Sequence, residues 1–458
     1  MESQYTHWDK VVKKVTHFDL DFSDKSIQTN FNKLMNHEIP SLDQFITICQ
    51  MATRYLSEYQ NVVDVDIQPH DKLVIVGDIH GCFESLIRMF FGTYKTEQYG
   101  LKEFPYQSVG FPSKKTIDVR KYELCQVARD EQEQPKQEFL ITLDQDIQTD
   151  NTPVQLEKFT QLGGGCRESS DEKDFRFQKQ IVNQQLIKLL ETDKLLSLEE
   201  NSKQRTIFLF NGDMIDKGGS SYQVLFWLLY LCLCGREIYL NRGNHEQDDV
   251  SLQFINNSPI VYELKRKFPD CDLNYIKPIL SDLFASLPIA TKFQKILTVH
   301  AGTPDTREEY YLKDLLQENR FKQKNFFWDP TGRETFWHSF VWNYNRNGST
   351  ALFMVRNDLD IVVCGHSPRC THNKRIFIKD VYKNNNEYAT GWALQNQMYN
   401  QKDVQPYDKN HKYFIEIFSS PTNNSEIFVG VLIADEHGVL PVDDNQWQYV
   451  KIGNYDEF

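Results

Sequence analysis

The 458-residue sequence predicts an α/β fold organised around the ends of five strands. Five short apolar runs are each followed directly by Asp, Asn or His. Open α/β sheets bind their ligands beyond the carboxyl ends of strands. Because chance placement of polar residues would not follow strand ends, we expect these residues to form one site. The runs are 73–77, 206–211, 237–241, 296–300 and 361–365.

The chain before these strands carries one well-marked helical pattern. Ser41 can cap a helix that runs to about Tyr59, with apolar side chains along one face. Residues 1–40 are polar and mixed, which indicates a partly ordered N-terminal arm. The other elements expected in this half are a short strand or turn at 62–67, the strand at 73–77 and a helix at 83–91.

A long polar segment, 93–203, separates the first site strand from the second. It is rich in Gln, Lys, Glu and Asp, and residues 130–150 carry seven acidic residues against one lysine. Such a composition is typical of a solvated loop, and the length exceeds that of an ordinary connection. We interpret 93–203 as an acidic insertion. A small second domain is the alternative, because 177–196 has helical apolar spacing.

The second half alternates helical and strand patterns. A further polar, irregular stretch at 367–412 indicates a second, smaller insertion or a long loop. The remaining expected elements are helices at 220–234, 259–268, 277–286 and 351–358, paired strands at 287–290 and 296–300, an aromatic loop at 326–348, and closing strands at 413–418 and 427–433.

Composition and charge exclude several classes of protein. The formal net charge of −13 argues against a general nucleic-acid binder. Nine scattered cysteines and an N-terminus without an apolar leader indicate reduced thiols in the cytoplasm. The longest apolar run, 224–234, has eleven residues and is too short to span a bilayer.

The polar residues at the strand ends have the chemistry of a two-metal centre. Mixed oxygen and nitrogen ligands favour Mn, Fe or Zn, as divalent or trivalent ions. Two such metals can clamp the attacking and leaving oxygens of a displacement at phosphorus and activate a shared water. The expected ligands are Asp78, His80 and Asp213 for the first metal and Asp213, Asn244, His300 and His366 for the second, with Asp213 bridging.

A catalytic acid is expected beside these ligands. His245 follows Asn244 in a turn, so it should point away from the metals and could protonate a leaving alkoxide. Asp216 is placed to orient that imidazole. Taken singly, Asp216 could be a helix cap and His300 a hydrogen-bonded core histidine. The ordered set of five strand ends favours the site.

In order along the chain, these motifs resemble those of the phosphoprotein phosphatase family, the metal-dependent serine/threonine protein phosphatases. The matching motifs are Gly77-Asp-Ile-His-Gly81, Gly212-Asp-Met-Ile-Asp-Lys-Gly218, Gly243-Asn-His-Glu246, His300-Ala-Gly302 and Gly365-His366. The resemblance covers 41–92 and 204–458, which we expect to form the catalytic domain.

The resemblance carries implications for fold and reaction. It implies the β-sandwich of mixed sheets flanked by helices of the calcineurin-like metallophosphoesterases, with a dimetal site at the carboxyl ends of the strands. It also implies hydrolysis of phosphoserine and phosphothreonine in proteins by direct attack of a hydroxide held by two metals, without a phosphoenzyme.

Two departures from the family pattern weaken the expected phosphate-binding site. The family uses two arginines there; Lys217 replaces one, and Arg346 is the nearest match to the other. A family tyrosine falls on Asn423. Because an ammonium cannot make the two-pronged contact of a guanidinium, we expect a slow enzyme.

Two other functions stay open. One is a weak or inactive phosphatase-fold scaffold, favoured by Lys217, Asn423 and the long insertions. The other is hydrolysis of a small phosphoester or a dinucleotide polyphosphate by the same site. The expected partners are a phosphoprotein substrate and a protein bound through 93–203, with no nucleic acid and no membrane span.

Overall fold

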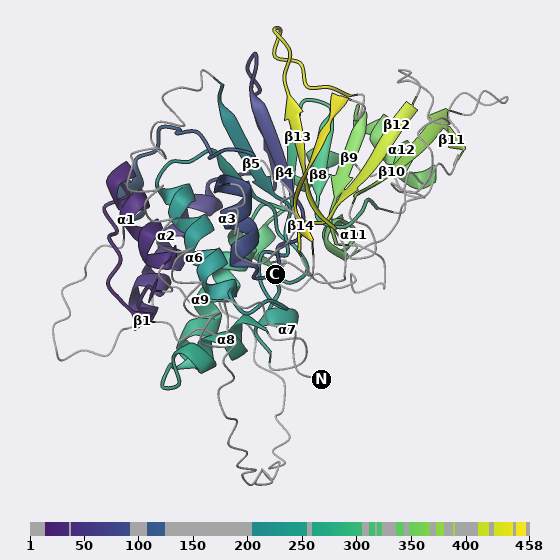
Figure 1. Cartoon of the computed structure of the whole chain (residues 1–458). Coiled ribbons are helices and arrows are strands. Elements are labelled where there is room, and N and C mark those ends of the chain that lie inside the picture. The colour runs from purple at the N-terminus through teal and green to yellow at the C-terminus, as the bar shows by residue number, and fades with distance from the viewer. Residues whose placement is uncertain are drawn as a thin grey trace, which may run out of the picture.

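Two stacked β-sheets with helices on both outer faces make up the molecule in a computed structural model of the chain (Figure 1). This layered arrangement confirms the expected α/β sandwich of mixed sheets. The residues that the structure describes are 14–35, 38–91, 108–123, 204–253, 259–304, 311–316, 318–322, 336–342, 348–366, 372–379, 388–389, 411–420, 426–442 and 446–454.

The first sheet has five strands in the order β14-β13-β4-β5-β6. Its centre is parallel, because β4 pairs with β5 and β5 with β6 in the same direction. The two closing strands run antiparallel to their neighbours. The strands are β4 (Lys72–Val76), β5 (Thr206–Phe210), β6 (Ile238–Leu240), β13 (Glu426–Ile433) and β14 (Gln448–Asn454).

The second sheet has seven strands in the order β11-β10-β12-β9-β8-β7-β3. Strands β12, β9 and β8 are parallel neighbours, while β7 and β10 run antiparallel to theirs. The strands are β3 (Val62–Asp64), β7 (Ala290–Phe293), β8 (Ile296–Val299), β9 (Ile361–Cys364), β10 (His372–Lys379), β11 (Tyr388–Ala389) and β12 (His411–Ile417).

Alternating side chains bind the layers together. Leu73 and Ile75 of β4 point between the sheets, where they share a core with Ile361 of the other sheet. Val74 and Val76 point the opposite way, into a core shared with helices. This period of two places each strand between two apolar layers and fixes its register.

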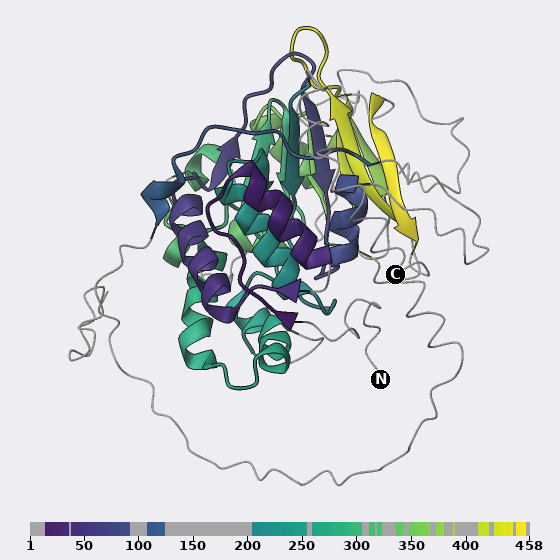
Figure 2. The same ribbon diagram turned by 60° about the vertical axis from the view of Figure 1, so that its left-hand side comes forward.

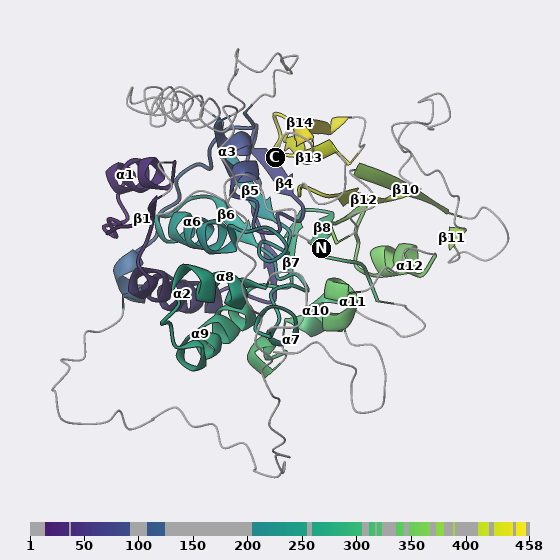
Figure 3. The ribbon, with the colours of Figure 1, turned by 60° about the horizontal axis from the view of Figure 1, so that its bottom comes forward.

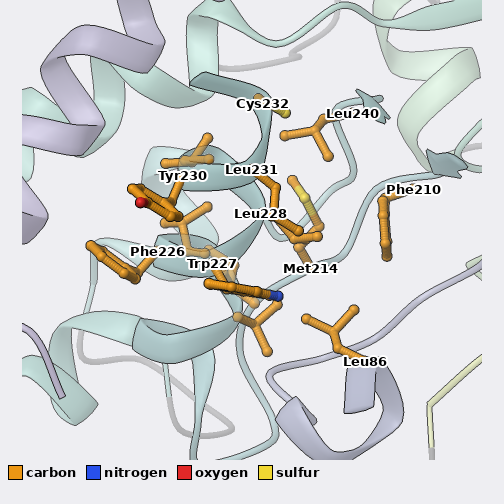
Figure 4. Packing of buried hydrophobic residues seen from close by; sticks show 14 of the residues in the cluster. Leu86, Phe210, Met214, Phe226, Trp227, Leu228, Tyr230, Leu231, Cys232 and Leu240 are labelled. Carbon is orange, nitrogen blue, oxygen red and sulfur yellow. The ribbon is translucent and has the colours of Figure 1, made fainter. Parts of the chain in front are cut away.

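The larger helical layer covers the outer face of the five-stranded sheet. Its central helix, α6 (Ser221–Leu233), is buried at every position, as expected for a helix that is apolar all round. Figure 4 shows Trp227 and Leu228 on the side of α6 that faces Leu86 and Met214. Around it lie α2 (Leu42–Ser57), α3 (Phe83–Phe91), α7 (Asp248–Ser251), α8 (Ile260–Lys267) and α9 (Leu273–Ser286).

Three shorter helices lie beside the seven-stranded sheet, on the opposite side of the molecule (Figure 3). Phe340 and Phe353 from two of them pack against Val362 of β9 and Phe414 of β12. The helices are α10 (Leu312–Leu315), α11 (Phe336–Trp342) and α12 (Gly348–Arg356), and a 3₁₀ turn spans Arg320–Lys322.

The prediction of a partly ordered N-terminal arm at 1–40 is wrong for the residues of this range that the structure describes. Helix α1 (Asp24–Met35) packs on α6, where the rings of Phe31 and Trp227 lie 5.4 Å apart (Figure 2). Phe18 meets Phe226 at 5.4 Å, and both are fully buried. Most of this segment is polar, and its few spaced apolar residues provide the packing. Short strands β1 (Lys14–Val15) and β2 (Glu38–Ile39) flank the helix.

Part of the expected insertion also belongs to the folded core. Residues 108–123 run along the start of β5. There the carbonyl of Ser113 accepts from the amide of Glu237 at 2.7 Å, and the amide of Ser113 donates to the carbonyl of Thr206 at 2.9 Å. Phe111 is 6% exposed and packs on Phe90 at 5.4 Å. The segment ends in a 3₁₀ turn at Val119–Tyr122. The helical pattern at 177–196 lies outside the described residues.

Smaller corrections concern single elements. The strand expected at 287–290 begins only at Ala290, and Leu287 is the C-cap residue of helix α9, which ends at Ser286. Helix α11 lies inside the expected aromatic loop, and strand β10 inside the expected irregular stretch 367–412. Strand β14 was not anticipated. The helix cap at Ser41 is confirmed, since its side chain accepts from the amide of Gln44.

We predict that 124–203 is dispensable for the folded core. Replacing it by a Gly/Ser linker should leave the melting midpoint nearly unchanged, because loop length costs little free energy. Phe111→Ala should instead cost about 3–5 kcal/mol and lower the midpoint by roughly 10 °C. Thermal unfolding followed by circular dichroism measures both. Failure of the linker variant to fold would place 177–196 in the core.

Candidate dimetal active site

Six polar side chains reach one place from the ends of strands in both sheets. They are buried, with no side chain more than 8% exposed. The first sheet contributes residues after its three parallel strands, and the second contributes a histidine after each of two. The residues are Asp78 and His80 after β4, Asp213 after β5, Asn244 after β6, His300 after β8 and His366 after β9.

Four of these side chains aim their polar atoms at a single point. His300 Nε2 lies 2.9 Å from Asn244 Oδ1, 3.2 Å from His366 Nδ1 and 3.3 Å from Asp213 Oδ1. His366 Nδ1 is also 2.9 Å from Asn244 Oδ1. Turning the Asn244 amide over would let its nitrogen donate to the same histidines and to Asp213. A cation at the centre of this group would favour the amide orientation in which Asn244 Oδ1 faces the cation.

A second group lies on the other side of Asp213. His80 Nε2 is 3.4 Å from Asp78 Oδ2 and 3.7 Å from Asp213 Oδ2. His245 Nε2 also approaches, 3.9 Å from Asp213 Oδ2. Among the described residues, Asp213 is therefore common to two clusters suited to a metal ion, His80 with His245 and His300 with His366.

The residues present fit two metal ions. Two ligand atoms that each lie about 2.1 Å from one metal, at right angles to each other, are about 3 Å apart. The distances from His300 Nε2 to its neighbouring polar atoms are close to this value. Asp78 Oδ2 is buried and accepts no hydrogen bond, which an anionic oxygen tolerates only with a cation nearby. Two glycines make room: a Cβ on Gly243 would meet Asp213 Oδ1 at 2.3 Å, and one on Gly365 would meet Asp78 Oδ1 at 2.3 Å.

Left-handed backbone conformations are concentrated at this site. Nine non-glycine residues in the described ranges have positive φ, and five of them are site residues, so the unusual backbone is tied to the site rather than spread through the loops. Each such residue costs about 1–3 kcal/mol, a cost that persists only where the surroundings impose it. The five are His80 (49°), Asp213 (51°), Asp216 (67°), Lys217 (59°) and His366 (65°).

The histidines of the site differ in the direction in which their pKa values are shifted. Burial, and then the charge of His300, lower the pKa of His366 to about 3, so its ring stays neutral and able to bind metal. Burial would lower the pKa of His300 too, but Asp213 and Asp78 outweigh burial and raise it to about 9. Asp213 keeps its negative charge, because His300 and His245 outweigh its burial and hold its pKa well below the ordinary value.

His245 forms a pair with Asp216. Its Nδ1 lies 2.8 Å from Asp216 Oδ2, while the other carboxylate oxygen of Asp216 accepts from the amide of Ile260 at 2.8 Å. Burial opposes the charge on His245, but Asp213 and Asp216 outweigh it and raise the pKa of the imidazole. The structure thus places the expected acid and its orienting carboxylate in direct contact.

Of the two expected phosphate-binding residues, the structure describes Lys217 alone. Lys217 lies at the site, with Nζ 2.7 Å from His80 Nε2. Its contact is therefore with an expected metal ligand. Arg346, like Asn423, lies outside the described residues.

Three supporting groups were not anticipated from the sequence. Glu246 accepts from the amides of Asp213, Met214 and Gly243 at 2.8, 2.8 and 2.9 Å, which locks two site turns together. Burial, and then the charge of Asp213, raise the pKa of Glu246 to about 7. Its place in Gly243-Asn-His-Glu246 was the available signal.

The other two groups support neighbouring parts of the site. The single hydroxyl proton of Ser251 is shared between two acceptors, the Asp216 carboxylate and the carbonyl of His245. Asn241 donates to Asn211 Oδ1 at 2.8 Å and to Thr298 O at 3.1 Å, so it ties the two sheets together beside the site. An asparagine directly after a strand was the signal for both Asn211 and Asn241; nothing in the sequence marks Ser251.

Comparison with known proteins agrees with this geometry. Residues 182–370 match the family described as calcineurin-like phosphoesterase. The chain is 34% identical over 110 residues to mouse serine/threonine-protein phosphatase with EF-hands 2, covering 24% of this chain and 14% of that protein. It is 32% identical over 119 residues to Arabidopsis thaliana serine/threonine-protein phosphatase 5, covering 26% of this chain and 20% of that one.

A solved structure extends the likeness of fold to nearly the whole chain. It is a protein serine/threonine phosphatase from Saccharomyces cerevisiae with similarity to human phosphatase PP5. The TM-score is 0.50 at 17% sequence identity, and the match covers 93% of this chain and 94% of that one. Residues 182–370 thus resemble calcineurin-like phosphoesterases, and the chain shares the fold of this yeast phosphatase. Over shorter stretches the chain is similar to serine/threonine protein phosphatases.

The matched region is a limited part of these relatives, 14% and 20% of the two proteins compared above. Among the described residues, no helix is both long enough and apolar enough to cross a bilayer.

Proposed function

We propose that this protein hydrolyses phosphoserine and phosphothreonine in proteins, using two metal ions held at the strand ends. The observation that carries the proposal is the pair of ligand clusters that share Asp213, with the His245–Asp216 pair beside them. Manganese, iron and zinc all suit these nitrogen and oxygen donors. The serine/threonine phosphatases among the relatives support the choice of a phosphoprotein as substrate.

Six side chains of this chain would hold the metals. Asp78, His80 and Asp213 would hold one, and Asp213, Asn244, His300 and His366 the other. When bound, the metals would supply an activated water as the nucleophile and neutralise charge on the phosphate.

His245 would supply the proton that the leaving group needs. Its Nδ1 contacts Asp216, so the ring is oriented and Nε2 faces the site, 3.9 Å from Asp213 Oδ2. Its raised pKa favours the protonated ring, which would pass the proton from Nε2 to the departing serine or threonine oxygen. Asp216 keeps the tautomer and stabilises the charged imidazole.

Lys217 would bind the substrate phosphate, with Arg346 as the second cation. We expect Lys217→Arg to raise kcat/KM on a phosphothreonine peptide by about tenfold to a hundredfold, because arginine adds one charge-assisted hydrogen bond to the phosphate in the transition state. Metal occupancy is measured in both proteins to exclude a loading effect. An unchanged kcat/KM, with His245→Ala still inactive, would show that residue 217 does not touch phosphate.

The proposal is tested by assaying manganese-supplemented protein on three substrates: a phosphothreonine peptide, a small aryl phosphate and a dinucleotide polyphosphate. Preference for the peptide supports protein phosphatase activity. Preference for either small substrate supports the alternative hydrolase. If the protein binds two metals and turns over none of the three, the scaffold function replaces the proposal.

Two finer points of the proposal concern the setting of the protein. We place it in the cytoplasm, where the buried thiols of Cys49, Cys82, Cys232 and Cys271 would stay reduced. We also propose that 124–203, the acidic remainder of the insertion, binds a protein partner. Loss of recognition of a natural phosphoprotein substrate in the linker variant, with activity on the peptide kept, would support this.

A further inference from the structure

The hydroxyl of Ser251 lies between the two members of the acid pair. Ser251 Oγ is within hydrogen-bond reach of Asp216 Oδ2 and of the carbonyl oxygen of His245. The carboxylate is the stronger of these two acceptors, because hydrogen bonds to charged groups are stronger than those between neutral groups. Ser251 is fully buried and Asp216 is 1% exposed, so water has little access to this bond. One side chain thus contacts both the orienting carboxylate and the backbone of the acid.

The short helix α7 brings Ser251 to this place. The helix begins at Asp248, soon after the turn that carries His245, and the amide of Ser251 donates to the carbonyl of Gln247 at 2.9 Å. Its first turn is also tied to α9, where Ser281 donates to Asp248 at 2.7 Å. A single helical turn therefore folds the chain back, so that Ser251 meets the carbonyl of the residue six positions earlier.

The other contacts of Asp216 come from helices α6 and α8. Asp216 Oδ1 accepts from the amide of Ile260, at the start of α8, at 2.8 Å. The amide of Asp216 donates to Ser221 Oγ of α6 at 3.0 Å. The remaining oxygen, Oδ2, lies 2.8 Å from His245 Nδ1 and also contacts Ser251. The hydroxyl therefore holds the carboxylate at the oxygen that orients the imidazole.

We propose that Ser251 is a positioning residue for the proton transfer. Its hydroxyl fixes the Asp216 carboxylate relative to the backbone of His245, and so keeps His245 Nε2 directed at the leaving oxygen. Misplacing a proton donor by a fraction of an ångström slows the transfer without weakening substrate binding. The benefit is confined to substrates whose leaving group needs a proton. This inference rests on the proposed function, in which His245 protonates a serine or threonine oxygen.

The test compares kcat and KM of the manganese-supplemented parent and of Ser251→Ala on a phosphothreonine peptide and on 4-nitrophenyl phosphate. On the peptide, kcat should fall about tenfold, the effect of one charge-assisted hydrogen bond, and KM should not change. On 4-nitrophenyl phosphate, kcat should change by less than about twofold, because nitrophenolate leaves without a proton. Ser251→Cys keeps the volume of the side chain and has only a weak donor, so it should show the same selective loss if the alanine variant does not fold.

A double-mutant cycle with His245→Ala provides a readout that a loss of stability would not produce. Because Ser251 acts through His245, adding Ser251→Ala to His245→Ala should cost no further activity on the peptide. The matched control is Ser281→Ala, which removes a buried hydroxyl that bonds to Asp248 of the same helix α7. This control should leave kcat on both substrates unchanged.

The outcomes separate this inference from the proposed function. An unchanged kcat of Ser251→Ala on the peptide would overturn the inference and leave the proposed function standing. So would an equal loss on both substrates, or a full additional loss in the His245→Ala background. A parent that binds manganese and hydrolyses neither substrate would overturn the proposed function, and the inference with it.

Discussion

Asp213→Asn is expected to abolish binding of both metals and to reduce phosphatase activity by about 10³-fold or more, since metal stabilisation of a phosphoryl transition state is worth several kcal/mol. Asp213 is the one carboxylate that both ligand clusters share. Asparagine keeps its shape but has only one oxygen and no charge. Metal content after dialysis against manganese, measured by mass spectrometry, should fall from near two equivalents to near none.

The control for this prediction is a matched change beside the site. Asp248 lies in α7, and its side chain accepts from Ser281 at 2.7 Å. Asp248→Asn should keep both metals and most of the activity. If Asp213→Asn still binds two equivalents, Asp213 does not bridge the metals. If it retains one, the residue belongs to a single metal.

His245→Ala is expected to lose about 10² to 10⁴ of kcat on a phosphothreonine peptide while both metals stay bound, the usual contribution of a general acid. The reason is that an alkoxide leaves poorly without a proton. On 4-nitrophenyl phosphate the loss should be much smaller, because nitrophenolate leaves without protonation. The difference between the two substrates therefore measures the acid role directly.

This variant also separates the two roles that the geometry allows His245. Its Nε2 lies near Asp213, so it belongs to one of the clusters suited to a metal. Retention of two metals supports the acid. Loss of one metal, with equal loss of activity on both substrates, would make His245 a ligand. His437→Ala changes a highly exposed histidine away from the site and should alter neither property.

Much of the fold could be predicted because the strands that carry the site are buried on both faces. Runs such as 73–77 and 361–365 are continuously apolar and end in glycine, a pattern that few other structures produce. The α1 segment escaped prediction because Phe18, Ile27 and Phe31 are diluted by polar neighbours. Residues 108–123 were missed because they pair with a segment distant in the sequence, as Lys114 does with Arg236. Strand β14 was missed although it pairs with the strand that precedes it, β13.

The residues of the site also fall into those that the sequence predicts and those that it does not. Its ligands follow strand ends, so a sequence pattern reveals them. The contact between Lys217 and His80 depends on how two turns pack, 137 residues apart. Ser251 is equally hidden, since its hydroxyl reaches Asp216 only after α7 folds against the site. Side chains that only support other residues follow no regular pattern in the sequence. Ligands at the ends of parallel strands do, because each one follows an apolar run.

The central claim is that the buried cluster around Asp213 holds two metals. The most direct test is anomalous diffraction from crystals grown with manganese. We predict two peaks on either side of the Asp213 carboxylate, about 3.5–4 Å apart as in two-metal hydrolases. One should lie beside His80 and the other between His300 and His366. Fully occupied manganese elsewhere, with no peak beside Asp213, would contradict the account.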